Sequence, residues 1–115
     1  MQTVTERGLT KEEKRQARAV AAAAHNAELS AALEELALLF ADWYKGRIDA
    51  FQLADAIHQF HDGQSRELFS RYRGGLRPED LAARAIAWEL VAPSEIPRGL
   101  RTALADRVER WRKLA

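Results

Sequence analysis

The feature that most constrains the fold is an uninterrupted helical pattern between Thr10 and Lys45. Glu13 follows Thr10 by three residues, which is the spacing of a capping box, where each side chain bonds the other residue's backbone N–H. Gly46 tolerates positive φ and is typical of the position just after a helix. We therefore predict one long helix from Thr10 to about Lys45. Residues 1–9 carry no periodic apolar pattern and are predicted to be disordered.

An apolar seam runs along the second half of this helix. Its members are spaced by four and three residues: Leu29, Leu33, Leu36, Phe40 and Trp43. A slimmer stripe precedes it, formed by Val20, Ala24, Ala27 and Ala31. Heptad spacing of this kind fits either the core face of a bundle helix or a coiled coil between two chains. We favour the core face, because a dedicated coiled coil needs about three to four sustained heptads.

Two further helices are expected after Gly46. Asp49 and Gln52 form a second capping box, so a helix should run from Ala50 to about His61. The dipeptide Asp62-Gly63 is typical of a turn. A third apolar pattern then ends at Gly74-Gly75, and the two helices either meet at a corner or form one kinked helix.

The last third of the chain predicts two more helices. Pro78 opens the first, Pro93 should end it, and its residues are apolar on nearly every side. We expect this helix to be the central one, with Trp88 among the most buried residues. Pro97 opens the final helix, whose apolar side consists of Leu100, Leu104, Val108 and Trp111.

The fold class follows from these patterns. No stretch alternates apolar and polar residues with period two, so no sheet is expected. With 115 residues, the chain has the length of one domain. We predict an all-α fold: a compact bundle of four to five helices over residues 10–115, in which the long N-terminal helix packs on an antiparallel or orthogonal set of shorter helices.

Composition narrows the range of functions. The chain has no cysteine, which excludes disulfides, thiolate chemistry and Cys-ligated metals. The net charge of +1 hides only a mild asymmetry, acidic up to Ser65 and basic after it, unlike the strongly basic surface of a dedicated nucleic-acid binder. The polar start lacks the apolar region of a secretory signal, and the six-residue apolar run Ala19–Ala24 is far shorter than the ~20 residues of a membrane span. We expect a cytoplasmic protein with no membrane partner.

The stretch IHQFHDGQSRELFSRY, residues 57–72, holds the candidate site residues. His58 and His61 are three positions apart, so on a helix their side chains are neighbours. With Asp62 they could hold one divalent metal ion, whose bound water would be a hydrolytic nucleophile. The interpretation we favour is structural: a histidine partly buried at the rim of an apolar face, and Asp62 as the cap of the next helix. A third possibility is an anion or partner site, with candidates His58, His61, Arg66 and Glu67.

The same stretch carries a family resemblance. The run IHQFHDGQSRELFSRY, followed by AARAIAWELV and by a last helix that begins with EIP, resembles a family of small uncharacterised bacterial helical proteins that share an IHxFHxGxxREL pattern. The resemblance covers the chain from about Ile48 to the C-terminus. It implies a helical fold and no assigned activity.

The function we expect is that of a non-enzymatic helical interaction or regulatory module without a cofactor, which forms a homo-oligomer or binds a protein partner. One alternative is the metal-dependent hydrolase built on His58, His61 and Asp62. Another is weak nucleic-acid binding through the arginines of the last helix, although acidic residues interrupt them. These arginines are Arg98, Arg101, Arg110 and Arg112.

Overall fold

The structure, a computed structural model, describes residues 8–114. Every regular element in this range is helical, and none of the described residues forms a strand, which confirms the predicted all-α class. Contacts within the chain divide it into two compact units. The hairpin unit comprises residues 25–75, and the terminal unit combines the described residues up to 24 with those from 76 onward. The predicted disorder of residues 1–9 falls mostly on residues 1–7, which lie outside the described range.

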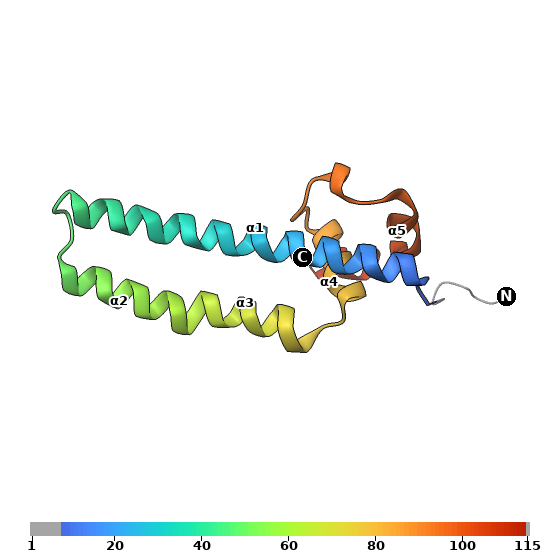
Figure 1. Cartoon of the computed structure of the whole chain (residues 1–115), viewed down its shortest axis with the longest axis horizontal. Helices are drawn as coiled ribbons and strands as arrows, with labels where there is room; N and C mark the ends of the chain where they lie inside the picture. The colour runs from blue at the N-terminus through green and yellow to red at the C-terminus, as the bar shows by residue number, and fades with distance from the viewer. Residues whose placement is uncertain (1–7, 115) are drawn as a thin grey trace. The chain divides into compact units, whose positions relative to one another are not determined.

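The first helix, α1, extends over Lys11–Tyr44 and contributes to both units (Figure 1). Its predicted capping box is present: the Glu13 backbone N–H donates to Thr10 Oγ1 at 3.0 Å, and the Thr10 N–H donates to Glu13 Oε1 at 3.0 Å. The predicted end is also confirmed, because Gly46 has φ of 78°. The Gly46 N–H donates to the Trp43 carbonyl and the Arg47 N–H to the Asp42 carbonyl, the pair of bonds that defines a Schellman motif.

The hairpin unit consists of two antiparallel arms. The first arm is the part of α1 from His25 to Tyr44. The second arm contains α2 (Ala50–Phe60), the π-helical segment η1 (His61–Ser65), α3 (Arg66–Ser70) and the π-helical segment η2 (Arg71–Gly75). The predicted capping box at the start of α2 is present, with Asp49 Oδ1 accepting from the Gln52 N–H at 2.8 Å and Gln52 Oε1 accepting from the Asp49 N–H at 2.9 Å.

No turn interrupts the second arm at Asp62-Gly63. Phe60, Ser65, Arg66 and Arg71, which flank η1 and α3, all have right-handed helical φ and ψ, so the backbone stays helical through the whole second arm. Of the two arrangements that the sequence allowed, the single helical run is therefore the one found.

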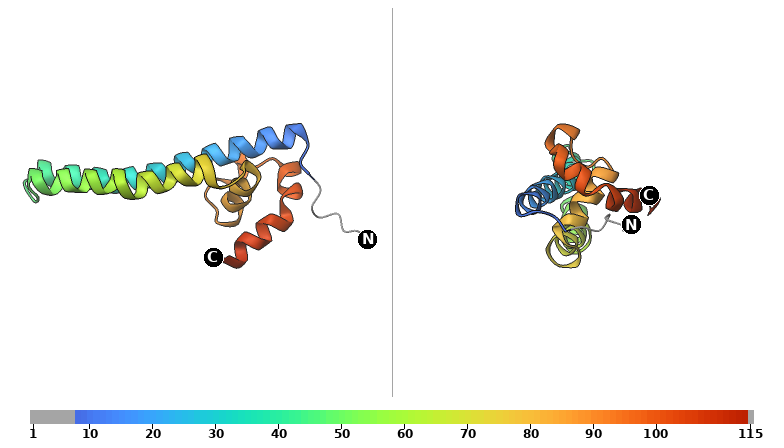
Figure 2. Two further views of the ribbon diagram at one scale, coloured as in Figure 1. Left: turned by 90° about the horizontal axis from the view of Figure 1, so that it is seen from below. Right: turned by 90° about the vertical axis from the view of Figure 1, so that its right-hand side faces the viewer.

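The terminal unit is built around α4 (Pro78–Ala87), as predicted. All six residues from Leu81 to Ile86 are buried. The first part of α1 adds Ala17, Val20, Ala21 and Ala24 to this core. The chain continues through the 3-10 turn η3 (Pro93–Glu95), α5 (Arg98–Ala103) and α6 (Ala105–Leu114), the red helix that leads to the C-terminus in Figure 2.

The predicted last helix is interrupted at Leu104, whose φ of −99° and ψ of 5° separate α5 from α6. The apolar side of this region is nevertheless confirmed in part. Leu100 and Leu104 are completely buried and Val108 is buried, while Trp111 is half-buried. The break therefore changes the direction of the chain without exposing its apolar side.

Two predictions about α4 were wrong. The helix ends at Ala87, well before Pro93, because Glu89 takes a left-handed φ of 57° and stops it. Trp88 is half-buried and does not belong to the most buried residues. Its position just after the last helical residue places its ring at the edge of the core, where it meets the Trp111 ring edge-on with centroids 5.6 Å apart.

Candidate interaction surface

The two arms of the hairpin unit meet along one row of side chains on each. The row on the first arm includes Ala32, Leu36 and Leu39, and the row on the second arm includes Leu53, Ala56, Phe60, Gln64 and Leu68. Only Ala32, Leu53 and Leu68 are fully buried among residues 25–75. Two helices share a single line of contact, so most of each arm's surface stays accessible.

The apolar seam of the first arm lies beside this line of contact. Leu33 and Phe40 follow Ala32 and Leu39 by one residue, so their side chains are rotated by about 100° away from the row that meets the second arm. Leu33 is 45% exposed, Phe40 43% and Trp43 44%. The interpretation of this seam as a covered core face was therefore wrong for these three residues, since close to half of each side chain remains accessible, whereas Leu29 and Leu36 are half-buried.

A second exposed row lies on the second arm. Ile57, His61, Ser65 and Phe69 each follow a residue of the inner row by one position. Ile57 and Phe69 are exposed apolar side chains, and His61, Ser65 and Phe69 line a shared hollow of about 210 Å³ together with Arg66. The row therefore forms one continuous strip along the arm.

The π-helical segments keep this strip straight. Residues spaced by four drift by about 40° per step on an α-helix, so a row of three such steps would wind around the arm. A π-helix takes more residues per turn, which removes the drift. Because η1 covers His61–Ser65, the steps from Ile57 to Phe69 remain on one side. The four-residue spacing is visible in the sequence and was the signal for this row that we missed.

Both exposed rows lie on the same side of the hairpin. In antiparallel right-handed helices that face each other, a step of one residue turns the side chain towards the same side of the pair on either helix. We call this side the apolar face. Its members are Leu29, Leu33, Phe40 and Trp43 from the first arm, and Ile57, His61, Ser65 and Phe69 from the second.

The opposite side of the hairpin is an acidic groove. Two hollows, of about 350 and 270 Å³, share Ala32, Glu35 and Gln64 and run along the arms. Their polar rim consists of Glu28, Glu35, Gln59, Gln64 and Glu67. This side therefore has an apolar floor, which includes Leu36, Leu39 and Phe60, and an acidic rim.

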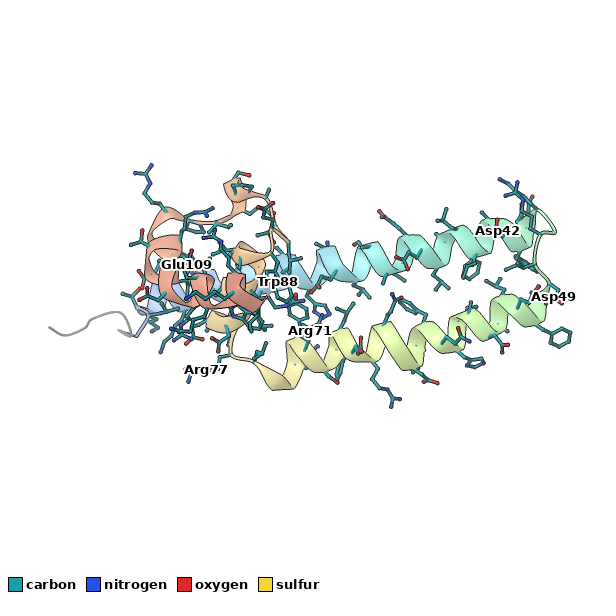
Figure 3. All side chains as sticks on the ribbon, turned by 180° about the vertical axis from the view of Figure 1, so that it is seen from behind. Asp42, Asp49, Arg71, Arg77, Trp88 and Glu109 are labelled. Carbon is teal, nitrogen blue, oxygen red and sulfur yellow. The ribbon has the colours of Figure 1, made fainter. Side chains whose placement is uncertain are left out.

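A cluster of polar and aromatic residues joins the arms at the end away from the loop. The Tyr72 hydroxyl donates a hydrogen bond to Glu28 Oε1 at 2.5 Å, and Arg71 Nη1 lies 3.6 Å from Glu28 Oε2. The His25 and Tyr72 rings are stacked, with centroids 4.4 Å apart and planes inclined by 5°. Figure 3 shows Arg71 on this part of the second arm and Asp49 at the opposite, loop end. These residues were not predicted, because they are more than 40 positions apart in the sequence.

The predicted site residues are distributed over both sides of the second arm. His58 is exposed, and the His61 side chain is 74% exposed, so the predicted burial of a histidine at an apolar rim was wrong. Asp62 does not cap α3; its carboxylate lies 3.3 Å from His61 Nδ1 and 3.9 Å from Arg66 Nη2. His61 and Arg66 share a hollow, whereas Glu67 lines the acidic groove.

The proposed metal ligands are not gathered. Over residues 8–114 no three His, Cys, Asp or Glu side chains form a group that could hold a metal ion, and this includes His58, His61 and Asp62. The arginines of the nucleic-acid alternative are exposed, and Arg112 pairs with Glu109 at 2.6 Å. The described residues thus do not gather the proposed metal ligands, and nucleic-acid binding by these arginines stays a prediction.

None of the helices described is both long enough and apolar enough to cross a membrane. The resemblance to proteins with the IHxFHxGxxREL pattern stays a prediction. Comparison of the chain with protein-family models, with curated proteins and with solved structures found no match.

Proposed function

We propose that the protein is a non-enzymatic helical interaction module that binds another protein chain through the apolar face of its hairpin unit. The observation that carries this proposal is the exposure of Leu33, Phe40 and Trp43 in one line on the first arm. Aromatic side chains of this size are the residues that most often dominate the energy of protein–protein association. Scattered single apolar residues need no explanation, but a line of three large exposed side chains with Ile57 and Phe69 on the same side of the hairpin does.

The surroundings of the strip also support association. The face is flanked by charged and polar residues, among them Glu34, His58 and Arg66, all of them exposed. An apolar centre with a polar rim is the usual anatomy of a protein interface. The helices that carry the face also have stabilised ends at the loop. The first arm ends in a Schellman motif, and the second arm begins with a complete capping box.

The test compares two polar substitutions on the first arm. Phe40→Gln removes an aromatic side chain from the apolar face, whereas Leu38→Gln makes a similar change at a residue that is 67% exposed and points away from the face. The free energy of unfolding of both variants and of the parent is measured by denaturant titration over a hundredfold range of protein concentration.

We expect the two variants to differ by less than about 1 kcal/mol in dilute solution, because surface substitutions have small effects. A loss for Phe40→Gln of about 3 kcal/mol or more at every concentration is the size found for core residues. That result would show that Phe40 belongs to the core of its own chain. The apolar face would then not be available to bind another protein, and the proposed function would be contradicted.

A further inference from the structure

A cavity of about 530 Å³ lies within the terminal unit. Its lining comes from the end of α4, the loop and 3-10 turn that follow it, α5 and α6. We propose that this cavity binds a small carboxylate with an aliphatic chain. Its volume is within the range of roughly 300–1,000 Å³ that is usual for small-molecule sites. The cavity has no residue in common with the apolar face, so this inference does not depend on the proposed function.

One part of the cavity wall is aliphatic. Ile86 and Ile96 are buried, Leu90 and Val91 are half-buried, and Pro93 is exposed. An apolar chain that covers these residues removes apolar surface of both partners from water, which favours binding. A small inorganic anion would leave this part of the wall uncovered. The ligand therefore requires an apolar body.

A second part of the wall carries positive charge. Arg101 from α5 and Arg112 from α6 line the cavity. Arg112 Nη1 lies 2.6 Å from Glu109 Oε2, whereas the Arg101 guanidinium forms no hydrogen bond or ion pair with any residue between 8 and 114. A guanidinium can hold a carboxylate with two parallel N–H···O bonds, and such charge-assisted bonds are stronger than neutral ones. Arg101 is therefore the residue that we assign to the carboxylate of the ligand.

A backbone donor in the same wall adds to the attraction for an anion. The Val91 N–H donates no hydrogen bond to any residue between 8 and 114, although Val91 is half-buried. Its neighbours differ, because the Leu90 N–H donates to the Ala85 carbonyl and the Ala92 N–H to Glu95 Oε1. Nearly all backbone N–H groups in folded proteins have a partner in the protein or in water. The Val91 N–H is therefore available to donate to an oxygen of the ligand.

The charge of the terminal unit also favours an anion. Its described residues contain twelve Lys and Arg and eight Asp and Glu, whereas the hairpin unit contains five and eight. An excess of positive charge attracts anions to the surface of the unit. Glu89 is the carboxylate in the lining of the cavity, and its charge opposes an anionic ligand. Removal of this charge should therefore strengthen binding.

Octanoate is the probe, because it combines a carboxylate with an aliphatic chain. Isothermal titration calorimetry of the full chain should give a dissociation constant on the order of 1 mM or lower, as expected for a ligand of this size. Octanol has the chain without the charge, and acetate has the charge without the chain. Each should bind at least about tenfold more weakly than octanoate. Equal affinity of octanol or of acetate would overturn the proposal, because one part of the wall would then contribute nothing.

Arg101→Gln tests the assignment of the carboxylate, and Arg98→Gln is the matched control. Both residues are exposed arginines of α5, but only Arg101 lines the cavity. We expect Arg101→Gln to weaken octanoate binding about tenfold, which is the size of the loss of a charge-assisted hydrogen bond. Arg98→Gln should stay within about twofold of the parent, since an exposed charge outside the site is screened by salt. Equal weakening by the two variants would mean that overall charge controls binding, and it would overturn the site.

Glu89→Gln should have the opposite effect. It removes the charge of the lining carboxylate and keeps the size of the side chain, so octanoate should bind about threefold more tightly. Asp106→Asn is the control, because it removes an exposed carboxylate of α6 that does not line the cavity, and it should leave the affinity unchanged. Unchanged or weaker binding by Glu89→Gln would overturn the position of the carboxylate in this cavity.

NMR spectroscopy locates the bound octanoate. The methyl signals of Val91 and Ile96 should shift as octanoate is added, those of Leu33 on the apolar face should not, and Phe40→Gln should bind octanoate like the parent. Shifts at Leu33 with none at Val91 and Ile96 would overturn the cavity as the site. Absence of octanoate binding would also overturn this inference. It would not affect the proposed function, which is tested separately by the stability of Phe40→Gln.

Discussion

Tyr72 and Glu28 are joined by a hydrogen bond of 2.5 Å between residues 44 positions apart, one on each arm of the hairpin unit. The Tyr72 ring is held at the same time by the stacked His25 ring. A neutral hydroxyl that donates to a carboxylate forms one of the stronger kinds of hydrogen bond. This contact fixes the arms to each other at the end that the loop does not connect.

Tyr72→Phe should therefore lower the free energy of unfolding by about 1–2 kcal/mol, because the ring stacking is kept and the hydrogen bond to Glu28 is lost. Tyr44→Phe is the control, since the Tyr44 side chain is 86% exposed and should tolerate the change within a few tenths of a kcal/mol. Denaturant titration at one fixed protein concentration measures both. Equal values for the two variants would show that the bond to Glu28 does not stabilise the hairpin.

A second prediction concerns Trp88, whose Nε1 donates to the Trp111 carbonyl at 3.1 Å and whose ring lies 4.6 Å from the Arg84 guanidinium carbon. Trp88→Phe should lose about 1 kcal/mol, since the ring contact survives in part and the hydrogen bond does not. Leu104→Ala, at a completely buried site, should lose about 2–5 kcal/mol and sets the scale for the core. A loss for Trp88→Phe as large as that for Leu104→Ala would place Trp88 in the core after all.

Two helix ends give predictions of opposite sign. Gly46 and Glu89 occupy the same position of a Schellman motif, both with positive φ, and the Leu90 N–H donates to the Ala85 carbonyl at 2.9 Å just as the Arg47 N–H does to Asp42. A non-glycine residue in this conformation is destabilised by roughly 1 kcal/mol. Glu89→Gly should therefore raise the free energy of unfolding by about 0.5–1 kcal/mol.

Gly46→Ala should lower the free energy of unfolding by a similar amount, about 1 kcal/mol. No atom lies within 4 Å of a Cβ built on Gly46, so the loss comes from the backbone conformation alone and not from a clash. Thermal melts of the two variants check both signs. A destabilised Glu89→Gly protein would mean that the Glu89 side chain makes a contribution larger than the strain of its backbone.

The first turn of α1 provides a prediction about pH. A hydrogen bond from the Arg15 side chain lowers the pKa of the Glu12 carboxyl below its ordinary value, with a further contribution from the charge of Arg15. The folded pKa is thus below the unfolded one, so the stabilising contribution is present above the unfolded pKa and is lost as pH falls through the folded value.

Carbon-detected NMR titration of the Glu12 carboxyl should show a midpoint below the ordinary value for a glutamate, and Arg15→Ala should raise the midpoint towards that value. An unchanged Glu12 midpoint after Arg15→Ala would show that the helix N-terminus, and not Arg15, lowers the pKa.

The helix starts and ends that depend on a few neighbouring residues could be predicted from the sequence. The pairs Thr10 with Glu13 and Asp49 with Gln52 marked helix starts, and Gly46 marked a helix end, because capping needs only atoms within one turn. The burial of α4 also followed from its composition, since an apolar helix must be surrounded.

What the sequence did not predict depends on contacts between distant segments. Whether Phe40 faces a core or solvent depends on how many helices surround the first arm. The spacing of the apolar residues is the same for a covered and for an exposed seam, so the sequence does not distinguish the two. Trp88 was assigned to the core from its helix, but its exposure depends on where Glu89 stops that helix. For the candidate site, the sequence predicted that His61 and Arg66 lie close together. It did not predict on which side of the hairpin they lie, because that depends on how the second arm packs against the first.

The π-helical turn η1 has a consequence for the length of the second arm. Deleting one residue from Asp62–Ser65 would let the arm form a regular α-helix, which costs little as local structure. The side chains beyond the deletion would keep nearly the same rotation about the arm axis, because a π-helical turn holds about one residue more than an α-helical turn. Phe69 would stay on the apolar face and Tyr72 near Glu28, so the arm can lose one residue within η1 without losing its register.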